Sequence, residues 1–140
     1  MPISPDDYKN VLRHFASGVT IVTIKAGEDV HGLTVSAFAS VSPDPPHITV
    51  LIDHSHHPYE LLERDDATFA VNILARDQAE LSNRFAFVHD EDRFAEGDWT
   101  TVETGAPVLA NALACLDCTI HARLPAGTHT IYVGEVQASA

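Results

Sequence analysis

Two long segments near the C-terminal end, separated by a tight turn, constrain the fold of this chain more than any other feature. Residues 112–123 alternate between apolar and polar side chains, and residues 129–136 follow after the short connection PAGT. A period of two is typical of a strand with one buried face. Proline and glycine in the connection favour a turn, so the sequence predicts an antiparallel hairpin with strands over residues 112–124 and 129–136.

The rest of the chain is predicted to contain short strands with short helices between them. A helix begins with Ser4 as its cap and ends at Gly18, and a turn at residues 26–29 joins two strands into a hairpin. The remaining assignments are strands over residues 19–25, 30–37, 47–53 and 68–74, helices over residues 58–64 and 77–87, an irregular proline-rich segment over residues 42–46, and a loop over residues 89–107 pinned by Phe94 and Trp99. Because no long helices regularly separate the strands, we expect a mainly β fold, an antiparallel barrel with flanking helices, rather than a doubly wound parallel sheet. No GxGxxG motif follows a strand, so a dinucleotide would not bind in the Rossmann manner.

The composition fits one soluble domain over residues 1–140. The chain has 20 acidic and 8 basic residues, and its net charge of −12 disfavours nucleic acid and membrane surfaces as partners. It contains no apolar run of about 18 residues, which a transmembrane helix would need. The N-terminus lacks the basic and apolar regions of a secretory signal. We therefore expect a cytoplasmic protein.

The two cysteines form a CxxC motif, Cys115 and Cys118, which is found in redox pairs and in zinc sites. Positions three apart on a strand point to opposite faces of the sheet, so these two thiols are not expected to meet. The chain has no second CxxC to complete a zinc site. We interpret both cysteines as ordinary small side chains in a reducing compartment.

The sequence GLTVSAFASVS, which begins at residue 32, is the most informative candidate for a binding site. Hydroxyl groups recur at every second position, at Thr34, Ser36, Ser40 and Ser42, with a break near Phe38. On a strand this spacing places small donors along one face, with room for a flat ligand that has a polar edge. A solvent-exposed strand face rich in serine and threonine explains the same pattern, and both interpretations remain open.

The sequence DHSHH at residues 53–57 also leaves alternatives open. His54 and His56 could share one face if the preceding strand continued, and imidazole is a common metal ligand. Pro58 is predicted to begin a helix directly afterwards, however, and the free N–H groups at a helix start suit an anion or phosphate. A solvated turn accounts for the same residues without any ligand. We assign no metal site here, and no GxSxG motif indicates a serine hydrolase.

Taken in order, several stretches resemble the flavin reductase-like family, the short-chain reductase components of two-component flavin-dependent monooxygenases. The most specific stretch is the hydroxyl-rich segment followed by Pro45 and Pro46. The other matching stretches are RHFASGVTIVT at residues 13–23, Asp53 with Ser55, VNIL at residues 71–74, residues 78–86 ending in RFA, DRF at residues 92–94, and GTHTI at residues 127–131 with GEV at residues 134–136. The resemblance covers nearly the whole chain.

The resemblance implies an FMN-binding split barrel, built as a homodimer with the flavin near the subunit interface. It implies oxidation of NADH or NADPH and reduction of FMN or FAD, with the reduced flavin passed to a separate monooxygenase. Carried over by position, it also implies contacts for ten residues. These are Thr34, Val35, Ser36 and Ala37 for the isoalloxazine ring, Asp53, His54 and Ser55 for the ribityl and phosphate side, Ser82 and Arg84 for the phosphate, and His129, as the catalytic residue, for the nicotinamide.

The chain departs from the family pattern at two places. Thr128 stands where the family usually has an aspartate beside the histidine, and family members generally continue beyond residue 140, so a fragment lacking a C-terminal segment is one interpretation of the chain. Two other functions fit the same barrel. One is a non-catalytic flavin-binding protein, and the other is an enzyme similar to pyridoxamine-phosphate oxidase.

Overall fold

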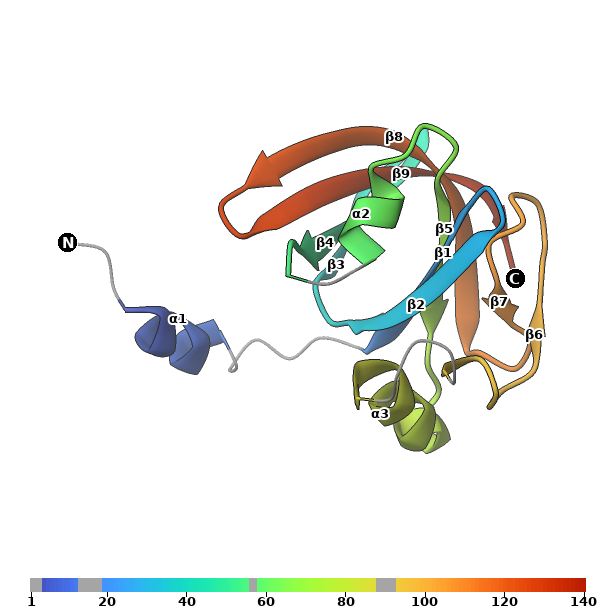
Figure 1. The fold of residues 1–140 in the computed structure, drawn as a ribbon, viewed down its shortest axis with the longest axis horizontal. Helices are drawn as coiled ribbons and strands as arrows, with labels where there is room; N and C mark the ends of the chain where they lie inside the picture. Colours follow the sequence, from blue (N-terminus) through green and yellow to red (C-terminus); the bar gives the residue numbers. More distant parts are fainter. Residues whose placement is uncertain (1–3, 13–18, 56–57, 88–92) are drawn as a thin grey trace.

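A single curved sheet of seven antiparallel strands forms most of the molecule (Figure 1). The computed structural model describes residues 4–12, 19–55, 58–87 and 93–140. The strands of the sheet are β1 (Thr20–Ala26), β2 (Asp29–Val35), β3 (Phe38–Pro43), β4 (Pro46–Asp53), β5 (Thr68–Ile73), β8 (Ala114–Ala126) and β9 (His129–Ser139), in the order β2-β1-β5-β8-β9-β4-β3. A small separate pair consists of β6 (Trp99–Thr100) and β7 (Val108–Leu109).

The sheet curls into a barrel that stays open along one seam. Strands β2 and β3 follow each other in the chain, yet they lie at opposite edges of the sheet. Only Ser36 and Ala37 separate them, so the two edges must approach each other at this crossing. The amide of Leu51 on β4 donates to the carbonyl of Ala37 at 3.2 Å and ties the crossing to the neighbouring strand. The predicted antiparallel split barrel is confirmed.

The barrel interior holds the main apolar core. Strand β1 lies between β2 and β5 and is buried on both faces over most of its length, which explains its run of β-branched residues. Residues of six strands and of the helix α2 (Pro58–Leu62) fill the interior, among them Val22, Ile24, Leu33, Val35, Val50, Ile52, Leu61, Leu62, Phe69, Val71, Cys118 and Tyr132.

The second face of β1, β5 and β8 is covered by the chain around β6 and β7. Asn72 on β5 is fully buried there, donates to the carbonyl of Ile21 at 3.0 Å and accepts from the amide of Leu109 at 2.8 Å. Asp117 on β8 is 1% exposed and accepts from the amide of Thr104 at 2.8 Å. The alternation of residues 112–123 predicted a solvated polar face at Asp117, and this is wrong because a segment distant in sequence covers that face.

The two cysteines lie on opposite faces of β8, as predicted. Cys115 packs with Ala70 and Val108 in the outer cluster, whereas Cys118 belongs to the barrel core. Both thiols are free and buried. Burial, followed by the nearby Asp117 carboxylate, raises the pKa of both thiols, and that of Cys118 rises to about 12. Neither thiol is therefore available as a thiolate near neutral pH.

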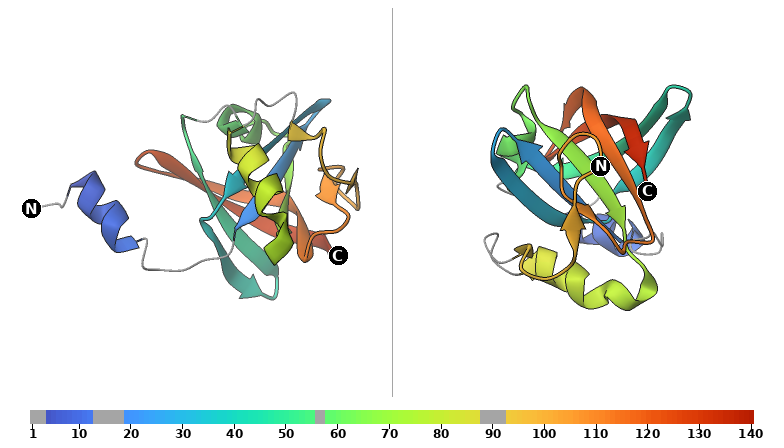
Figure 2. Two further views of the ribbon diagram at one scale, coloured as in Figure 1. Left: turned by 90° about the horizontal axis from the view of Figure 1, so that it is seen from below. Right: turned by 90° about the vertical axis from the view of Figure 1, so that its right-hand side faces the viewer.

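The helices lie around the barrel (Figures 1 and 2). Helix α1 (Pro5–Leu12) extends away from it, capped by Ser4, whose hydroxyl accepts from the amide of Asp7 at 3.1 Å; the predicted helix end at Gly18 lies outside the described residues. The 3-10 turn η1 (Arg76–Gln78) leads into α3 (Ala79–Phe87), which packs against β2. None of the described helices combines the length and the apolar character that crossing a bilayer requires.

An aromatic cluster fixes the chain after α3. The ring centroids of Phe85, Phe94 and Trp99 lie 5.0 to 5.3 Å from one another. A Cβ atom at Gly32 on β2 would lie 2.5 Å from the ring of Phe85, so only glycine allows this approach. The predicted anchoring role of Phe94 and Trp99 is confirmed, although the strands β6 and β7 in this region were not predicted.

The proline-rich segment is more regular than predicted. Strand β3 continues through Pro43 and β4 begins at Pro46, so only Asp44 and Pro45 form the turn, with a cis peptide bond between them. Strand β3 is at the sheet edge, where a proline need not donate to a neighbouring strand. The prediction of an irregular segment over residues 42–46 is wrong except at the turn itself.

Candidate functional site

A polar cleft of about 180 Å³ opens at the seam of the barrel, where β2 passes into β3. It is formed by the end of β2, the crossing residues, the end of β4 and the start of β9. Its lining residues are Leu33, Thr34, Val35, Ser36, Ala37, Leu51, Ile52, Asp53 and His129. Six of the ten residues predicted for a flavin and nicotinamide site therefore line one cleft, although they come from three separate parts of the sequence.

The chain at the crossing is held by hydrogen bonds on both sides. The hydroxyl of Thr34 donates to the carbonyl of Ser82 on α3 at 2.6 Å, and the hydroxyl of Thr20 donates to the carbonyl of Val35 at 2.7 Å. Ser36 and Ala37 remain exposed between the two strands. A backbone fixed in this way can offer polar groups to a ligand without losing further conformational freedom.

The four hydroxyl groups of the GLTVSAFASVS segment do not share one strand face. Thr34 belongs to β2, Ser36 lies between the strands, and Ser40 and Ser42 lie on β3 on either side of a break in its pairing with β4. Only Thr34 and Ser36 line the cleft. The break near Phe38 is the point at which the chain crosses from one sheet edge to the other.

Asp53 and His129 face each other at the other side of the cleft. They are direct cross-strand partners at the end of β4 and the start of β9. The hydroxyl of Thr128 lies 2.9 Å from Nδ1 of His129 and holds the imidazole ring. Threonine thus provides a hydrogen-bonding partner for the ring at the position where the family usually has an aspartate, so contacts of the ring with a ligand are left to Nε2 and the ring face.

The side chains of His54 and Ser55 are not among the residues lining the cleft. Nε2 of His54 lies 2.7 Å from the hydroxyl of Thr130, and its ring packs against that of Tyr59 at a tilt of 39°, with centroids 4.4 Å apart. The amide of Ser55 donates to Oδ1 of Asp53 at 2.8 Å, which closes a turn. His54 therefore serves the packing of this turn, and the other member of the predicted histidine pair, His56, lies outside the described residues.

Ser82 and Arg84 on α3 line two further hollows. Ser82 lines a hollow of about 300 Å³ and is joined to the cleft through its hydrogen bond with Thr34. Arg84 lines a hollow of about 660 Å³ together with the carboxylates of Glu80 and Glu96, and its Nε donates to the carbonyl of Arg93 at 3.2 Å. The structure thus places Ser82 next to Thr34 of the cleft and Arg84 further along the same helix.

A second polar cluster, which the sequence analysis missed, lies on β4, β8 and β9. It consists of His47, His121 and Glu135, whose ligand atoms lie within 4.8 Å of one another. The three residues are far apart in sequence, and only the strand order brings them together. No local spacing pattern could have revealed this cluster.

An antiparallel barrel that is open along one seam, with a polar cleft at that seam, defines the split-barrel class of proteins. Solved structures of this class include a putative flavin reductase from Haemophilus somnus, which is 34% identical to this chain and superposes with a TM-score of 0.93. The match covers 99% of this chain and 88% of the chain in that structure. The similarity therefore extends over nearly every described element.

The chain belongs to the flavin reductase like domain family, whose pattern matches residues 12–139. An NADH-dependent flavin reductase from a Rhodococcus species is 42% identical over 139 residues, which cover 96% of this chain and 76% of the relative. The reductase component of an FADH2-dependent resorcinol hydroxylase from a Rhizobium species is 38% identical, with 93% of this chain and 74% of the relative covered. The resemblance seen in the sequence is confirmed.

Proposed function

We propose that this protein is an NAD(P)H-dependent flavin reductase that reduces FMN or FAD by hydride transfer and supplies the reduced flavin to a partner monooxygenase. The observation that carries the proposal is the meeting of Thr34, Ser36, Asp53 and His129 in one cleft at the seam of the barrel. The functions in the names of the two relatives, flavin reduction with NADH and reductase component of a hydroxylase, support it.

The cleft fits a flat ring with a polar edge. Its lining includes the small or apolar residues Val35 and Ala37, while Thr34 and Ser36 add hydroxyl groups at the crossing. Small-molecule sites usually have volumes of about 300–1,000 Å³, so the cleft in a single chain is too small to enclose a whole flavin nucleotide. The residues of the cleft would hold the ring, and the ribityl and phosphate groups would lie outside it.

The chemistry of the reaction asks little of the protein beyond orientation. A flavin bound here supplies the ring system that accepts a hydride from a reduced nicotinamide. The residues at the crossing bind the ring edge, Asp53 accepts hydrogen bonds from hydroxyl groups of the flavin side chain, and His129 positions the nicotinamide through Nε2 or its ring face. Holding two reactants in a fixed relative orientation is a large source of rate acceleration, so hydride transfer does not require a general acid–base pair.

We further propose FMN or FAD as the flavin and NADH or NADPH as the reductant. Arg84 and Ser82 are the residues proposed for the flavin phosphate, because the family resemblance implies this role and α3, which carries both, is bonded to Thr34 of the cleft through Ser82. His54 and Ser55, from the turn after β4, are proposed to approach the ribityl and phosphate side through backbone groups, since the side chain of His54 is engaged with Thr130.

We also propose a homodimer that completes the site. Helix α1 extends from the barrel, and Val11 on it is 62% exposed. Leu113 and Leu124 on and beside β8 are exposed to 70% and 60%. A second subunit that covers this apolar surface is proposed to lie near the flavin, as the family resemblance implies. The buried free thiols suit a reducing location such as the cytoplasm.

Steady-state oxidation of NADH and of NADPH in the presence of excess FMN or FAD tests this proposal. We expect oxidation well above the rate without protein, with saturation in both flavin and nicotinamide. Flavin binding without nicotinamide oxidation would indicate the non-catalytic flavin-binding protein instead. Oxidation of pyridoxamine phosphate with bound FMN would indicate the third function considered above.

A further inference from the structure

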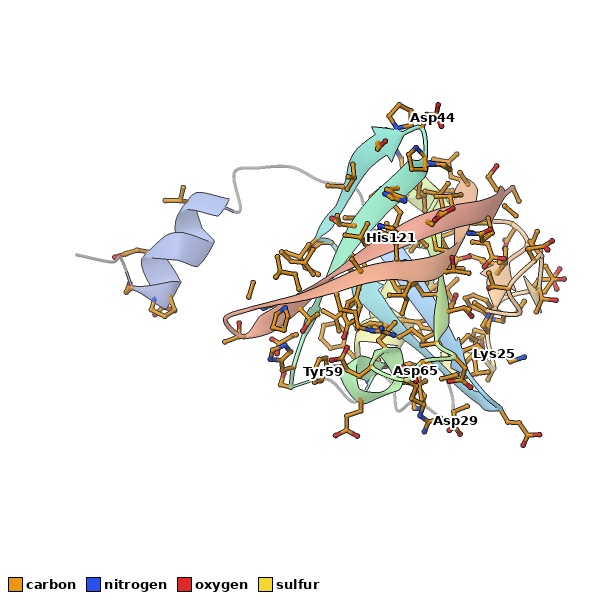
Figure 3. The ribbon with its side chains drawn as sticks, turned by 90° about the horizontal axis from the view of Figure 1, so that it is seen from above. Lys25, Asp29, Asp44, Tyr59, Asp65 and His121 are labelled. Atoms are coloured by element: carbon orange, nitrogen blue, oxygen red, sulfur yellow. The ribbon has the colours of Figure 1, made fainter. Side chains whose placement is uncertain are left out.

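We propose that His47, His121 and Glu135 form a binding site for a divalent transition metal, with zinc as the best-matched ion. The three side chains come from three adjacent strands, β4, β8 and β9, and lie on one face of the sheet. Nε2 of His47 lies 3.8 Å from a carboxylate oxygen of Glu135, and the rings of His47 and His121 have centroids 4.4 Å apart. Figure 3 labels His121, which lies on β8, the strand next to β9.

An irregularity in β8 turns His121 towards the cluster. Ile120 pairs with Gly134 and Ala122 pairs with Val133, so His121 is an extra residue with no partner on β9. Such a bulge increases the local twist and re-aims the side chain of the extra residue. Glu135, by contrast, is in regular register, directly opposite His47 on β4 and Thr119 on β8.

The imidazole of His47 provides an independent sign of a missing ligand. Its side chain is only 13% exposed, and Nε2 is buried without a hydrogen-bond partner among the described residues. Buried polar nitrogen atoms in proteins are nearly always satisfied. At 3.8 Å, the carboxylate of Glu135 is too far away for a hydrogen bond but close enough to share a metal ion.

The donor set matches zinc chemistry. Two neutral imidazole nitrogen atoms and one carboxylate oxygen are ligands that zinc takes at about 2.0–2.2 Å, with a water molecule in the fourth position. The ligand atoms lie within 4.8 Å of one another, so small side-chain rotations bring them to the separations of a tetrahedral site. A divalent cation also reduces the negative charge of a chain whose net charge is −12.

The proposed metal site is separate from the cleft. His47 and Glu135 are opposite each other near one end of the β4–β9 pair, and Asp53 and His129 are opposite each other at its other end. Six residues of strand correspond to about 20 Å. A metal ion at this distance clamps β4, β8 and β9 together and takes no part in hydride transfer, so the inference does not depend on the proposed function.

Zinc binding to the full chain, freed of any purification tag and treated with a chelator, tests the proposal. Titration against a zinc-binding dye measures affinity, and cobalt absorption in the visible range reports a four-coordinate site. The ligand variants are His121→Gln and Glu135→Gln. Glu28→Gln, at an exposed position in the turn between β1 and β2, is the matched control.

We expect one zinc ion per chain, a four-coordinate cobalt spectrum, and a Tm that rises by several degrees at saturating zinc. Each ligand variant should weaken binding at least about tenfold and remove the cobalt spectrum, because even changes to the outer-shell partners of metal ligands cost about 10- to 100-fold in affinity. Glu28→Gln should behave as the wild type. Zinc affinity that is unchanged in His121→Gln, or the absence of a four-coordinate cobalt spectrum in the wild type, would overturn the proposal, because binding would then come from other histidines or from none.

Discussion

Asp53 and His129 are direct cross-strand partners at the mouth of the cleft, one at the end of β4 and the other at the start of β9. The amide of His54 donates to the carbonyl of Thr128 at 2.9 Å, so the turns that follow Asp53 and precede His129 are bonded to each other. The position of the histidine therefore depends on a strand pairing between residues 76 positions apart, and its ring is held by Thr128.

Replacing His129 by alanine should impair the use of nicotinamide and leave flavin binding nearly unchanged. We expect kcat/KM for NADH to fall by roughly tenfold to a hundredfold, because a contact that positions the nicotinamide is lost. Thr128→Val, which removes only the hydrogen bond to the ring, should lower kcat/KM for NADH by roughly twofold to tenfold. Steady-state kinetics and a flavin titration measure both effects. A loss of flavin affinity in His129→Ala equal to the loss in kcat/KM would contradict this role.

Arg84→Ala should weaken the binding of FMN far more than the binding of riboflavin, which has no phosphate. A charge-assisted bond to phosphate is worth about 1.5–3 kcal/mol, which corresponds to roughly a tenfold to hundredfold change in affinity. Arg64→Ala, at an exposed position that lines neither the cleft nor the two hollows, is the control and should change neither affinity. Because Arg84 also donates to the carbonyl of Arg93, the Tm of the variant must be measured alongside. Equal losses for both flavins would mean that Arg84 does not bind the phosphate.

Asp117→Ala should destabilise the fold without affecting flavin affinity. The carboxylate accepts hydrogen bonds from the amides of Glu103 and Thr104 and from the hydroxyl of Thr104. Hydrogen bonds to a charged group contribute about 1.5–3 kcal/mol, so we expect a loss of about 2–3 kcal/mol in the free energy of unfolding. Urea denaturation measures this loss, with the exposed Asp66→Ala as the control. A variant as stable as the control would show that Asp117 does not hold this segment.

The order of strands and turns could be predicted from the sequence because it depends on local patterns. The hairpin turn at Gly27, the alternation in β8 and the β-branched residues of β1 are all visible within a few residues. The same local patterns could not show that the predicted strand over residues 30–37 ends before Ser36. The chain crosses between sheet edges there, and only the pairing of β2 with β1 and of β3 with β4 shows it.

Features that depend on contacts between distant segments were missed or misjudged. The sequence pattern predicted a solvated Asp117 because the segment that covers it, around Thr104, was expected to be a loop and not to pack on this strand. The cluster of His47, His121 and Glu135 requires the order β8-β9-β4 as well as a bulge in β8. The residues of the cleft were found through family resemblance, since the pattern of hydroxyl groups alone fits a solvated strand equally well.

The buried Cys118 thiol should make the protein less stable at alkaline pH. Its pKa rises from the usual 9.0 to about 12, first because of burial and then because of Asp117. Above pH 9 the unfolded chain loses this proton while the folded chain keeps it, so the free energy of unfolding falls as pH rises from about 9 towards 12. The slope is at most about 1.4 kcal/mol per pH unit for one thiol.

Urea denaturation between pH 8 and pH 11 checks this dependence in two variants. Cys118→Ala should be less stable than the wild type at pH 8 but should lose less stability on going to pH 11. Leu116→Ala, on the same strand, should be destabilised by a similar amount at both pH values. If the free energy of unfolding falls equally steeply with pH in Cys118→Ala and in the wild type, other groups, such as the buried Tyr132, account for the loss of stability.

Anaerobic mixing of the protein and oxidised flavin with one equivalent of NADH tests the central claim most directly. The wild type should bleach the flavin absorbance rapidly. Ser36→Trp, which fills the cleft at the crossing between β2 and β3, should keep its fold by circular dichroism and lose both flavin binding and bleaching. Two results would contradict the assignment of this cleft as the site of flavin reduction. One is that the wild type bleaches the flavin no faster than NADH does without protein, and the other is that folded Ser36→Trp bleaches it as fast as the wild type.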